Sequence, residues 1–154
     1  MTIDDLPSAP FGREQIELLL PHRGPMLLID VIDSYHVPER ISGRKLVQTD
    51  ELFLQGHFPG RPVLPGVIVI EAMGQVAACL AYLSTPAQER RLGIHLMSLD
   101  RVKFRRPVLP GDELRFDVRT LRVRGPIWNF NAKAYVEDQL AAQARYLAAF
   151  AEET

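Results

Sequence analysis

The sequence predicts an α+β domain in which one buried helix is wrapped by a highly curved antiparallel sheet. The stretch 66–83 is apolar nearly all round, as expected of a helix buried on every side. The second half of the chain alternates apolar and polar residues in three successive runs, which is the period of half-buried strands. With 154 residues, 47% of them hydrophobic, we expect one compact domain over 11–154 after a flexible acidic tail at 1–10.

Four features are expected before the central helix. Helical spacing of apolar residues within 11–20, stopped by Pro21, predicts a short helix. Apolar runs at 26–32 and 41–49 predict two strands. The stretch 55–66 holds three glycines and three prolines, too many for the interior of a helix or strand. We therefore expect a shaped loop directly before the central helix.

The central helix has clear boundary signals. Pro65 stands at a first-turn position, and the Ser84-Thr85-Pro86 run ends the apolar stretch. Glu71 and Gln75 interrupt that stretch, so it lacks the uninterrupted apolar length of a membrane span. We expect burial inside the protein, no membrane insertion, and a polar connector at 87–91.

An antiparallel meander is expected after the helix. The segment 92–104 predicts a long strand with an irregularity near Asp100, and the corner RRPVLPGD follows it. Turns are expected at Gly125-Pro126 and at 137–139. Period-two apolar positions define the three strands between these corners: Leu114, Phe116 and Val118, then Trp128, Phe130, Ala132, Ala134 and Val136, then Leu140, Ala142, Ala144, Tyr146, Ala148 and Phe150.

Charge and composition exclude several function classes. A formal net charge of −1 gives no overall field for nucleic acid or an anionic membrane. Cys79 is the only cysteine and the first residues do not have the pattern of a signal peptide, so we expect a cytoplasmic protein without disulfides. His22, His36 and His95 are scattered without the spacing of metal ligands, and no glycine-rich phosphate loop follows a strand. We expect neither a metal nor a cofactor.

Glu71 is an ionisable group in the middle of the apolar helix. Desolvation disfavours a charged carboxylate, so we expect the Glu71 pKa to be raised and the protonated side chain to donate a proton near neutral pH. Gln75 lies one helical turn later on the same face and could orient Glu71 by hydrogen bonding. The alternative is a structural role for Glu71 in an ion pair or at a dimer edge.

His57 and Gly66 flank the glycine- and proline-rich loop. A histidine in a loop is usually a surface or packing residue, but this loop can bring the His57 imidazole toward the helix start. Neutral imidazole is a natural general base near pH 7. Gly66 lies in the first helical turn, where backbone N–H groups could polarise a thioester carbonyl. The alternative is that Gly66 only permits close packing.

Three segments carry a resemblance to a known family. The string GHFPGRPVLPGVIVIEAMGQ resembles the signature of the broad-specificity hydroxyacyl-[acyl-carrier-protein] dehydratases, and LLPHRGPMLLIDVI and KFRRPVLPGDEL resemble two further segments of that family. The resemblance implies a hot-dog fold with the long helix at its centre. It also implies homodimers with two shared active sites, in which His57 of one subunit meets Glu71 of the other, and assembly of three dimers into a hexamer.

The resemblance also implies an activity. The implied enzyme is a hydro-lyase that converts (3R)-3-hydroxyacyl-[acyl-carrier-protein] to the trans-2-enoyl thioester in fatty acid biosynthesis. Whether the product also supplies lipid A precursors is left open by the sequence. Glu71 resembles the dehydratases that do not isomerise the new double bond, whose sister enzymes usually carry aspartate there. The chain departs from the family at 24–26, where an aromatic residue, proline and phenylalanine are common, and at Gly74, where alanine is usual. Both departures bear on chain length.

Two sets of residues are candidates for holding the substrate. Phe58 and Val67 are expected at the mouth of an apolar acyl tunnel, although apolar stripes of this kind are more often plain core. A basic patch could dock the acidic carrier protein, or could instead be a solvated strand edge that discourages edge pairing. The patch consists of Arg101, Lys103, Arg105 and Arg106.

Other functions are compatible with the same fold. The nearest alternatives are an acyl thioesterase and a dehydratase that also isomerises. An alternative of a different class is a non-catalytic subunit that binds acyl carrier protein. The presence of both His57 and Glu71 argues against this last alternative, because a decayed site is expected to have lost one of them.

Overall fold

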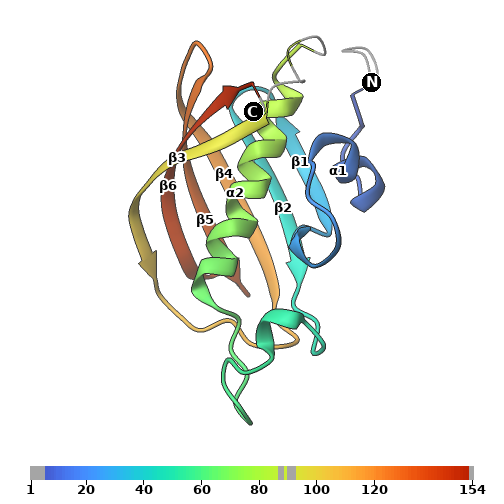
Figure 1. Cartoon of the computed structure of the whole chain (residues 1–154), viewed down its shortest axis with the longest axis vertical. Helices are drawn as coiled ribbons and strands as arrows, with labels where there is room; N and C mark the ends of the chain where they lie inside the picture. The colour runs from blue at the N-terminus through green and yellow to red at the C-terminus, as the bar shows by residue number, and fades with distance from the viewer. Residues whose placement is uncertain (1–5, 87–88, 90–92, 153–154) are drawn as a thin grey trace.

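The computed structural model describes residues 6–86, 89 and 93–152 (Figure 1). Residues 1–5 of the expected tail and most of the expected connector 87–91 lie outside the described residues. The helices are α1 (Arg13–Leu19), η2 (Gly24–Met26), η3 (Leu52–Leu54) and α2 (Gly66–Leu83). The strands are β1 (Val31–His36), β2 (Arg40–Leu46), β3 (Gly93–Phe104), β4 (Glu113–Arg124), β5 (Ile127–Val136) and β6 (Gln139–Ala151).

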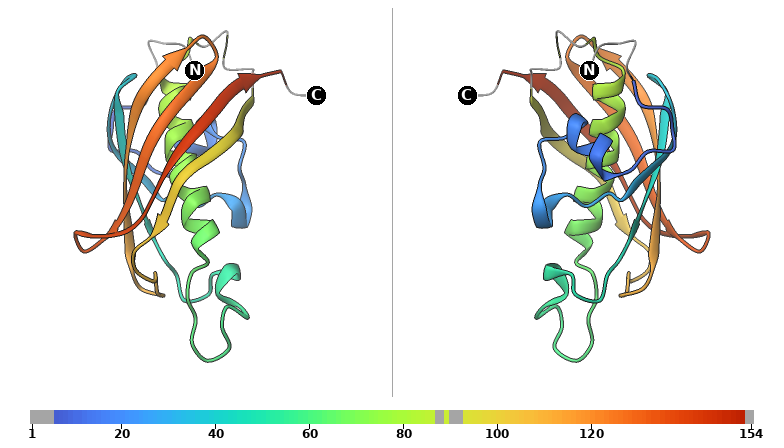
Figure 2. Two further views of the ribbon diagram at one scale, coloured as in Figure 1. Left: turned by 90° about the vertical axis from the view of Figure 1, so that its left-hand side faces the viewer. Right: turned by 90° about the vertical axis from the view of Figure 1, so that its right-hand side faces the viewer.

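A six-stranded antiparallel sheet curves around α2 (Figure 2). The strand order is β1-β2-β4-β5-β6-β3, so β4, β5 and β6 form the expected meander. Strand β3 precedes this meander in the sequence but pairs with β6 at the far end of the sheet. The predicted arrangement of one long helix wrapped by a curved sheet is confirmed.

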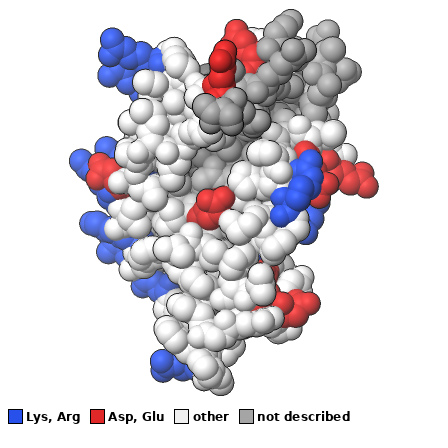
Figure 3. Space-filling view, in the orientation of Figure 1, with Lys and Arg blue, Asp and Glu red and all other residues white. Residues whose placement is uncertain are grey.

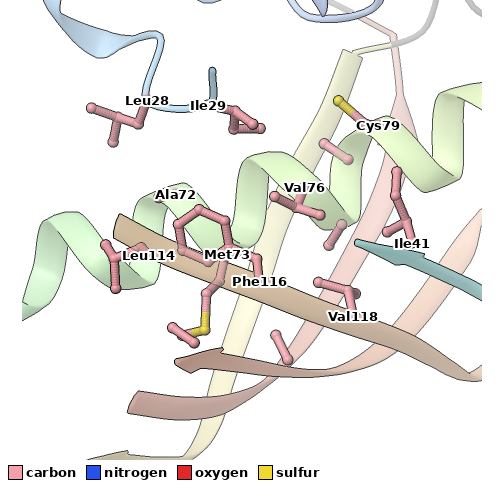
Figure 4. Close-up of a cluster of buried hydrophobic side chains, with 14 of the residues drawn as sticks. Leu28, Ile29, Ile41, Ala72, Met73, Val76, Cys79, Leu114, Phe116 and Val118 are labelled. Atoms are coloured by element: carbon pink, nitrogen blue, oxygen red, sulfur yellow. The ribbon is translucent and has the colours of Figure 1, made fainter. Parts of the chain in front are cut away.

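Helix α2 is the centre of the core. Its apolar side chains contact the inner face of the sheet, where Met73 and Val76 lie near Phe116 and Val118 (Figure 4). By length and composition α2 could cross a membrane, but 72% of it is buried inside the protein. The helix ends where the sequence predicts, because the Ser84 hydroxyl donates to the Leu80 carbonyl at 2.6 Å.

The N-terminal segment packs onto this scaffold. Helix α1 confirms the expected short helix, and it ends directly before Leu20 and Pro21. Leu6, within the segment expected to be a tail, packs against the core. The Tyr35 hydroxyl donates a hydrogen bond of 2.8 Å to the carbonyl of Pro7.

The strand expected over 26–32 is wrong in its position. Strand β1 begins only at Val31, and the buried Leu28 precedes it in an irregular segment. The side chain of Gln75 on α2 replaces the missing strand partner. Its Oε1 accepts the Leu28 N–H at 2.9 Å, and its Nε2 donates to the Met26 carbonyl at 2.7 Å. Apolar periodicity could not reveal this, because the backbone bonds go to a side chain distant in the sequence.

Strand β3 carries the irregularity expected near Asp100. Its register with β6 shifts between Asp100 and Lys103, and Arg101 there has a φ of 52°. Beyond its first two residues the strand is exposed, apolar residues included. The exposed apolar side chains are Leu96, Met97, Leu99, Val102 and Phe104.

Candidate active site

Two hollows lie beside α2, one at its N-terminal end and the other along its middle. One, of about 520 Å³, holds His57 and is here named the His57 groove. The other, of about 150 Å³, holds Glu71 and is named the Glu71 cleft. The His57 groove is lined among others by Gly66, Val67, Phe104, Arg105 and Arg106. The Glu71 cleft is lined among others by His22, Gly74, Gln75, Ile94, Leu96 and Tyr146.

His57 is held by its own loop. Its Nδ1 lies 2.7 Å from the carbonyl oxygen of Val63, and the Val63 N–H donates to the His57 carbonyl at 2.7 Å. A carbonyl oxygen can only accept, so Nδ1 carries the hydrogen, and in the neutral imidazole Nε2 keeps its lone pair. The loop therefore presents Nε2 of His57 as a proton acceptor.

Gly66 begins α2 directly against an aromatic ring. A Cβ at this position would lie 2.6 Å from Cε1 of Phe104, so any larger residue would require the ring to shift. The first N–H groups of a helix have no partner within it and lie at the positive end of the helix dipole. Both roles expected for Gly66 thus have a physical basis: the close packing is observed, and Gly66 lines the His57 groove.

Phe58 and Val67 lie near His57 in different ways. The Phe58 ring stacks on the His57 ring with centroids 4.3 Å apart, and about half of Phe58 remains exposed. Val67 lines the His57 groove and is 71% exposed. Their part in an acyl tunnel stays a prediction.

Glu71 is surrounded by hydrogen-bond donors. Gln75 Nε2 donates to its Oε1 at 3.0 Å, which is the bond that the helical spacing predicts. His22 Nε2 lies 3.3 Å from the same oxygen. These contacts, above all the hydrogen bond from His22, lower the Glu71 pKa and outweigh the opposing effect of burial. The expected rise of this pKa is therefore wrong for the single chain.

His22 is the site residue that sequence reasoning missed. In the sequence it is one of three scattered histidines, but the fold places it against Glu71 in the Glu71 cleft. Its place within the LLPHRGPMLLIDVI segment was the available signal. The two residues are 49 positions apart, and His22 lies in an irregular segment. The spacing of residues in helices or strands therefore cannot predict this contact.

Tyr146 closes the Glu71 cleft from β6. Its hydroxyl donates to the carbonyl of Ile70 on α2. Burial, together with the nearby charge of Glu71, raises the Tyr146 pKa. Tyr146 therefore remains a neutral phenol that anchors the sheet to the helix.

The four residues of the expected docking patch are not equivalent. Arg105 and Arg106 line the His57 groove, whereas Arg101 and Lys103 lie exposed on β3. The Arg106 guanidinium donates to Gln139 Oε1 at 2.9 Å and lies 3.7 Å from an Asp112 carboxylate oxygen. Arg106 is thus partly engaged within its own chain.

His57 and Glu71 line different hollows within one chain. The two hollows contact opposite ends of β3. Ile94 and Leu96, near the start of the strand, line the Glu71 cleft, whereas Phe104 at its end lines the His57 groove. One copy of the chain therefore holds the two predicted catalytic groups apart.

Comparison with known proteins identifies the family. Residues 20–145 match the FabA-like domain. The chain is 46% identical over 138 residues to the 3-hydroxyacyl-[acyl-carrier-protein] dehydratase FabZ of Geotalea uraniireducens, covering 90% of this chain and 95% of that protein. It is 48% identical over 143 residues to the protein of the same name from Geobacter metallireducens, covering 92% and 95%.

Solved structures share the fold at lower sequence identity. The dehydratase heterocomplex ApeI:P of Xenorhabdus doucetiae superposes with a TM-score of 0.76 at 18% identity, covering 90% of this chain and 91% of that chain. A putative thioesterase from Ralstonia eutropha gives 0.63 at 18% identity, covering 77% and 83%. These likenesses concern the fold alone, which is the predicted hot-dog fold. On its sequence, this chain belongs to the FabA-like family and, within it, to the FabZ 3-hydroxyacyl-[acyl-carrier-protein] dehydratases.

Proposed function

We propose that this protein dehydrates 3-hydroxyacyl groups on acyl carrier protein in fatty acid biosynthesis, with His57 and Glu71 from two copies of the chain acting on one substrate. Its close similarity to FabZ dehydratases supports the reaction. The observation that carries the site is the placement of the His57 groove and the Glu71 cleft at opposite ends of β3.

A second copy paired along β3 would join the two hollows. The outer edge of β3 has no strand partner within the described residues, and apolar side chains are exposed along it. Antiparallel pairing about a twofold axis near Leu99 sets the start of one β3 beside the end of the other. Ile94 of the Glu71 cleft then lies opposite Phe104 of the partner's His57 groove, which supports two shared sites per dimer.

The surface over α2 is suited to such a contact. Figure 3 shows the middle of this face largely uncharged apart from one acidic group, with Lys and Arg side chains along the left-hand edge and others at the right. Depletion of charge at the centre is typical of a stable interface. We extend the proposal to a trimer of dimers on the family resemblance alone, and to a cytoplasmic location.

The chemistry follows from the groups in the joined site. The thioester carbonyl accepts a hydrogen bond from the Gly66 N–H, which makes the C2 proton more acidic. Nε2 of His57 takes that proton while Glu71 protonates the C3 hydroxyl, which leaves as water. The products are the trans-2-enoyl thioester, protonated His57 and ionised Glu71, and proton exchange with solvent restores both groups.

Glu71 has to be protonated at the moment of transfer. In the single chain its pKa is lowered and 39% of its side chain is exposed. A docked partner and a bound acyl chain would remove the remaining water from the Glu71 cleft, and this loss of solvent favours the uncharged acid. Assembly and substrate thus supply the burial that the sequence led us to expect.

Acyl carrier protein is the partner that this reaction requires. We propose that Arg105 at the rim of the His57 groove, together with Arg101 and Lys103, attracts the acidic carrier. Phe58 and Val67 would contact the arm that brings the thioester to His57. A supply of lipid A precursors remains a proposal from the family resemblance.

A complementation experiment tests the shared site. His57→Ala and Glu71→Gln should each fold like the wild type and lose about 10² to 10⁴ in turnover, because each lacks one proton-transfer group. When the two variants are denatured together and refolded as a mixture, half of the dimers are mixed, and each contains one intact site. Dehydratase activity should then return to about a quarter of the wild-type value.

The readout separates the alternatives. Mass spectrometry of the carrier-bound products distinguishes 2-enoyl from 3-enoyl chains, and a thiol assay detects thioester hydrolysis. No recovery in a mixture shown to contain mixed dimers would place both groups in one chain. Full activity in either single variant would remove that residue from the mechanism.

A further inference from the structure

We infer that His22 is a positioning residue for Glu71: with Gln75 it holds Oε1 of the carboxyl group, so that Oε2 is the oxygen that gives its proton to the substrate. This inference rests on the proposed function, because it assigns a role to a residue that acts through Glu71. It starts from the two donors that converge on one oxygen, at 3.3 Å from His22 and 3.0 Å from Gln75.

The tautomer of His22 follows from its surroundings. Its Nδ1 is buried and has no hydrogen-bond partner among the residues that the structure describes. A buried N–H without an acceptor is costly, so the hydrogen belongs on Nε2, where the Glu71 carboxylate accepts it. His22 is thereby oriented as a donor to Glu71.

The backbone around His22 is fixed by Arg23. The Arg23 guanidinium donates to the carbonyls of Leu20 and His22, both at 2.7 Å, and to the carbonyl of Glu17 at 2.8 Å. These bonds join the last turn of α1 to the segment that follows it. The imidazole of His22 is therefore carried by a fixed turn.

Gln75 fixes the other end of the same segment. Besides holding Glu71, its amide bonds the backbone of Met26 and Leu28. One side chain thus connects the proton donor, the helix and the segment that presents His22. This accounts for the irregular course before β1, because a regular strand there would leave the Gln75 amide without these partners.

Two donors on Oε1 have a chemical consequence. An oxygen that already accepts two hydrogen bonds behaves as the carbonyl oxygen of the acid, so the acidic hydrogen resides on Oε2. Stabilising the ionised carboxylate also makes Glu71 a stronger proton donor once it is protonated. Precise orientation of a proton donor contributes to rate through geometry.

Matched substitutions separate a hydrogen-bond donor from a packing group. In His22→Gln the amide nitrogen can take the place of Nε2, whereas His22→Leu has similar bulk and no donor. We expect His22→Leu to lose about ten- to a hundredfold in kcat with KM little changed, since orientation of the transition state is lost. His22→Gln should stay within about threefold of the wild type.

The pH profile of kcat/KM gives a readout that a structural role would not move. Loss of the donor raises the Glu71 pKa, so the limb set by Glu71 should move to higher pH in His22→Leu and stay in place in His22→Gln. The other groups facing this carboxyl group in the described residues, Gln75 and Tyr146, are unchanged in both variants.

Opposite outcomes overturn the inference. An equal loss of kcat in His22→Leu and His22→Gln would give His22 a structural role only. A lower kcat in His22→Leu with no shift in either limb of the pH profile would lead to the same conclusion. If His22→Leu does not fold, His22→Asn replaces it, because its shorter amide does not reach Oε1. Wild-type turnover of 3-hydroxyacyl carrier protein is measured first. An inactive wild type would refute the proposed function, and an active wild type with unaffected variants would refute the role of His22 alone.

Discussion

The His57 groove and the Glu71 cleft differ in how their functional groups are held. His57 is fixed by Val63, six residues away in the same loop. Glu71 is held by His22, which is distant in the sequence and comes from the segment after α1, and by Gln75, which also bonds the segment before β1. One group is positioned locally and the other by tertiary structure. His57, the proposed proton acceptor, should therefore tolerate distant substitutions that disturb Glu71, the proposed proton donor.

Loss of the β3 contact should have the largest effect, because it separates the two hollows. Leu99 lies in the middle of the exposed strand, and we expect Leu99→Asp to yield single chains. Turnover should fall by about 10² to 10⁴, the same loss as expected when one proton-transfer group is removed. Light scattering after gel filtration measures the mass. Leu18→Asp is the matched control, since Leu18 is also exposed, at 72%, but lies on α1. Full activity in a monomeric Leu99→Asp protein would contradict the shared site.

Gly66→Ala should damage the His57 groove and leave the Glu71 cleft intact. The new Cβ would lie 2.6 Å from Phe104 Cε1, so the ring or the helix has to move. Overpacking of this kind costs about 1–3 kcal/mol of stability. Chemical denaturation and turnover measure the two effects. The double variant Gly66→Ala/Phe104→Leu should recover much of the stability, and unchanged stability in Gly66→Ala alone would show that the ring is free to shift.

Gly74→Ala should have the smallest effect and should act in the Glu71 cleft. A Cβ there would lie 3.2 Å from Cε1 of Tyr146, whose hydroxyl is bonded to the Ile70 carbonyl. Helix propensity favours alanine by about 0.5–1 kcal/mol, which offsets the tight contact. We expect nearly unchanged stability and a few-fold lower kcat/KM for the longest acyl chains. A chain-length series followed by mass spectrometry tests this, and an unchanged preference would place the acyl chain elsewhere.

The sequence predicted those parts of the fold and site that depend on local patterns. The bounds of α2, the irregularity near Asp100 and the hydrogen bond between Gln75 and Glu71 all follow from spacing along one element. His57 and Glu71 were found through their residue types in an unusual context. Their catalytic roles stay predictions until the variants are assayed.

The remaining features depend on contacts between distant segments. The start of β1 was misplaced because Gln75 takes over backbone bonds that a strand would otherwise make. The predicted rise of the Glu71 pKa is wrong because the hydrogen bond from His22 lowers this pKa by more than burial raises it. Burial can be inferred from an apolar helix, but the donors that converge on a carboxyl group come from the whole fold.

The contact between Phe104 and Gly66 links quaternary structure to electrostatics. Phe104 ends the strand on which we propose that a second copy docks, and its ring occupies the space of a side chain on Gly66. A displaced β3 would therefore push on the amide that is meant to receive the thioester oxygen. In the proposed dimer, each site of an isolated chain would lack its second reacting group, and the contact of Phe104 with Gly66 would lose the support of the paired strand. Dissociation of the proposed dimer would then lower the activity without any separate regulatory element.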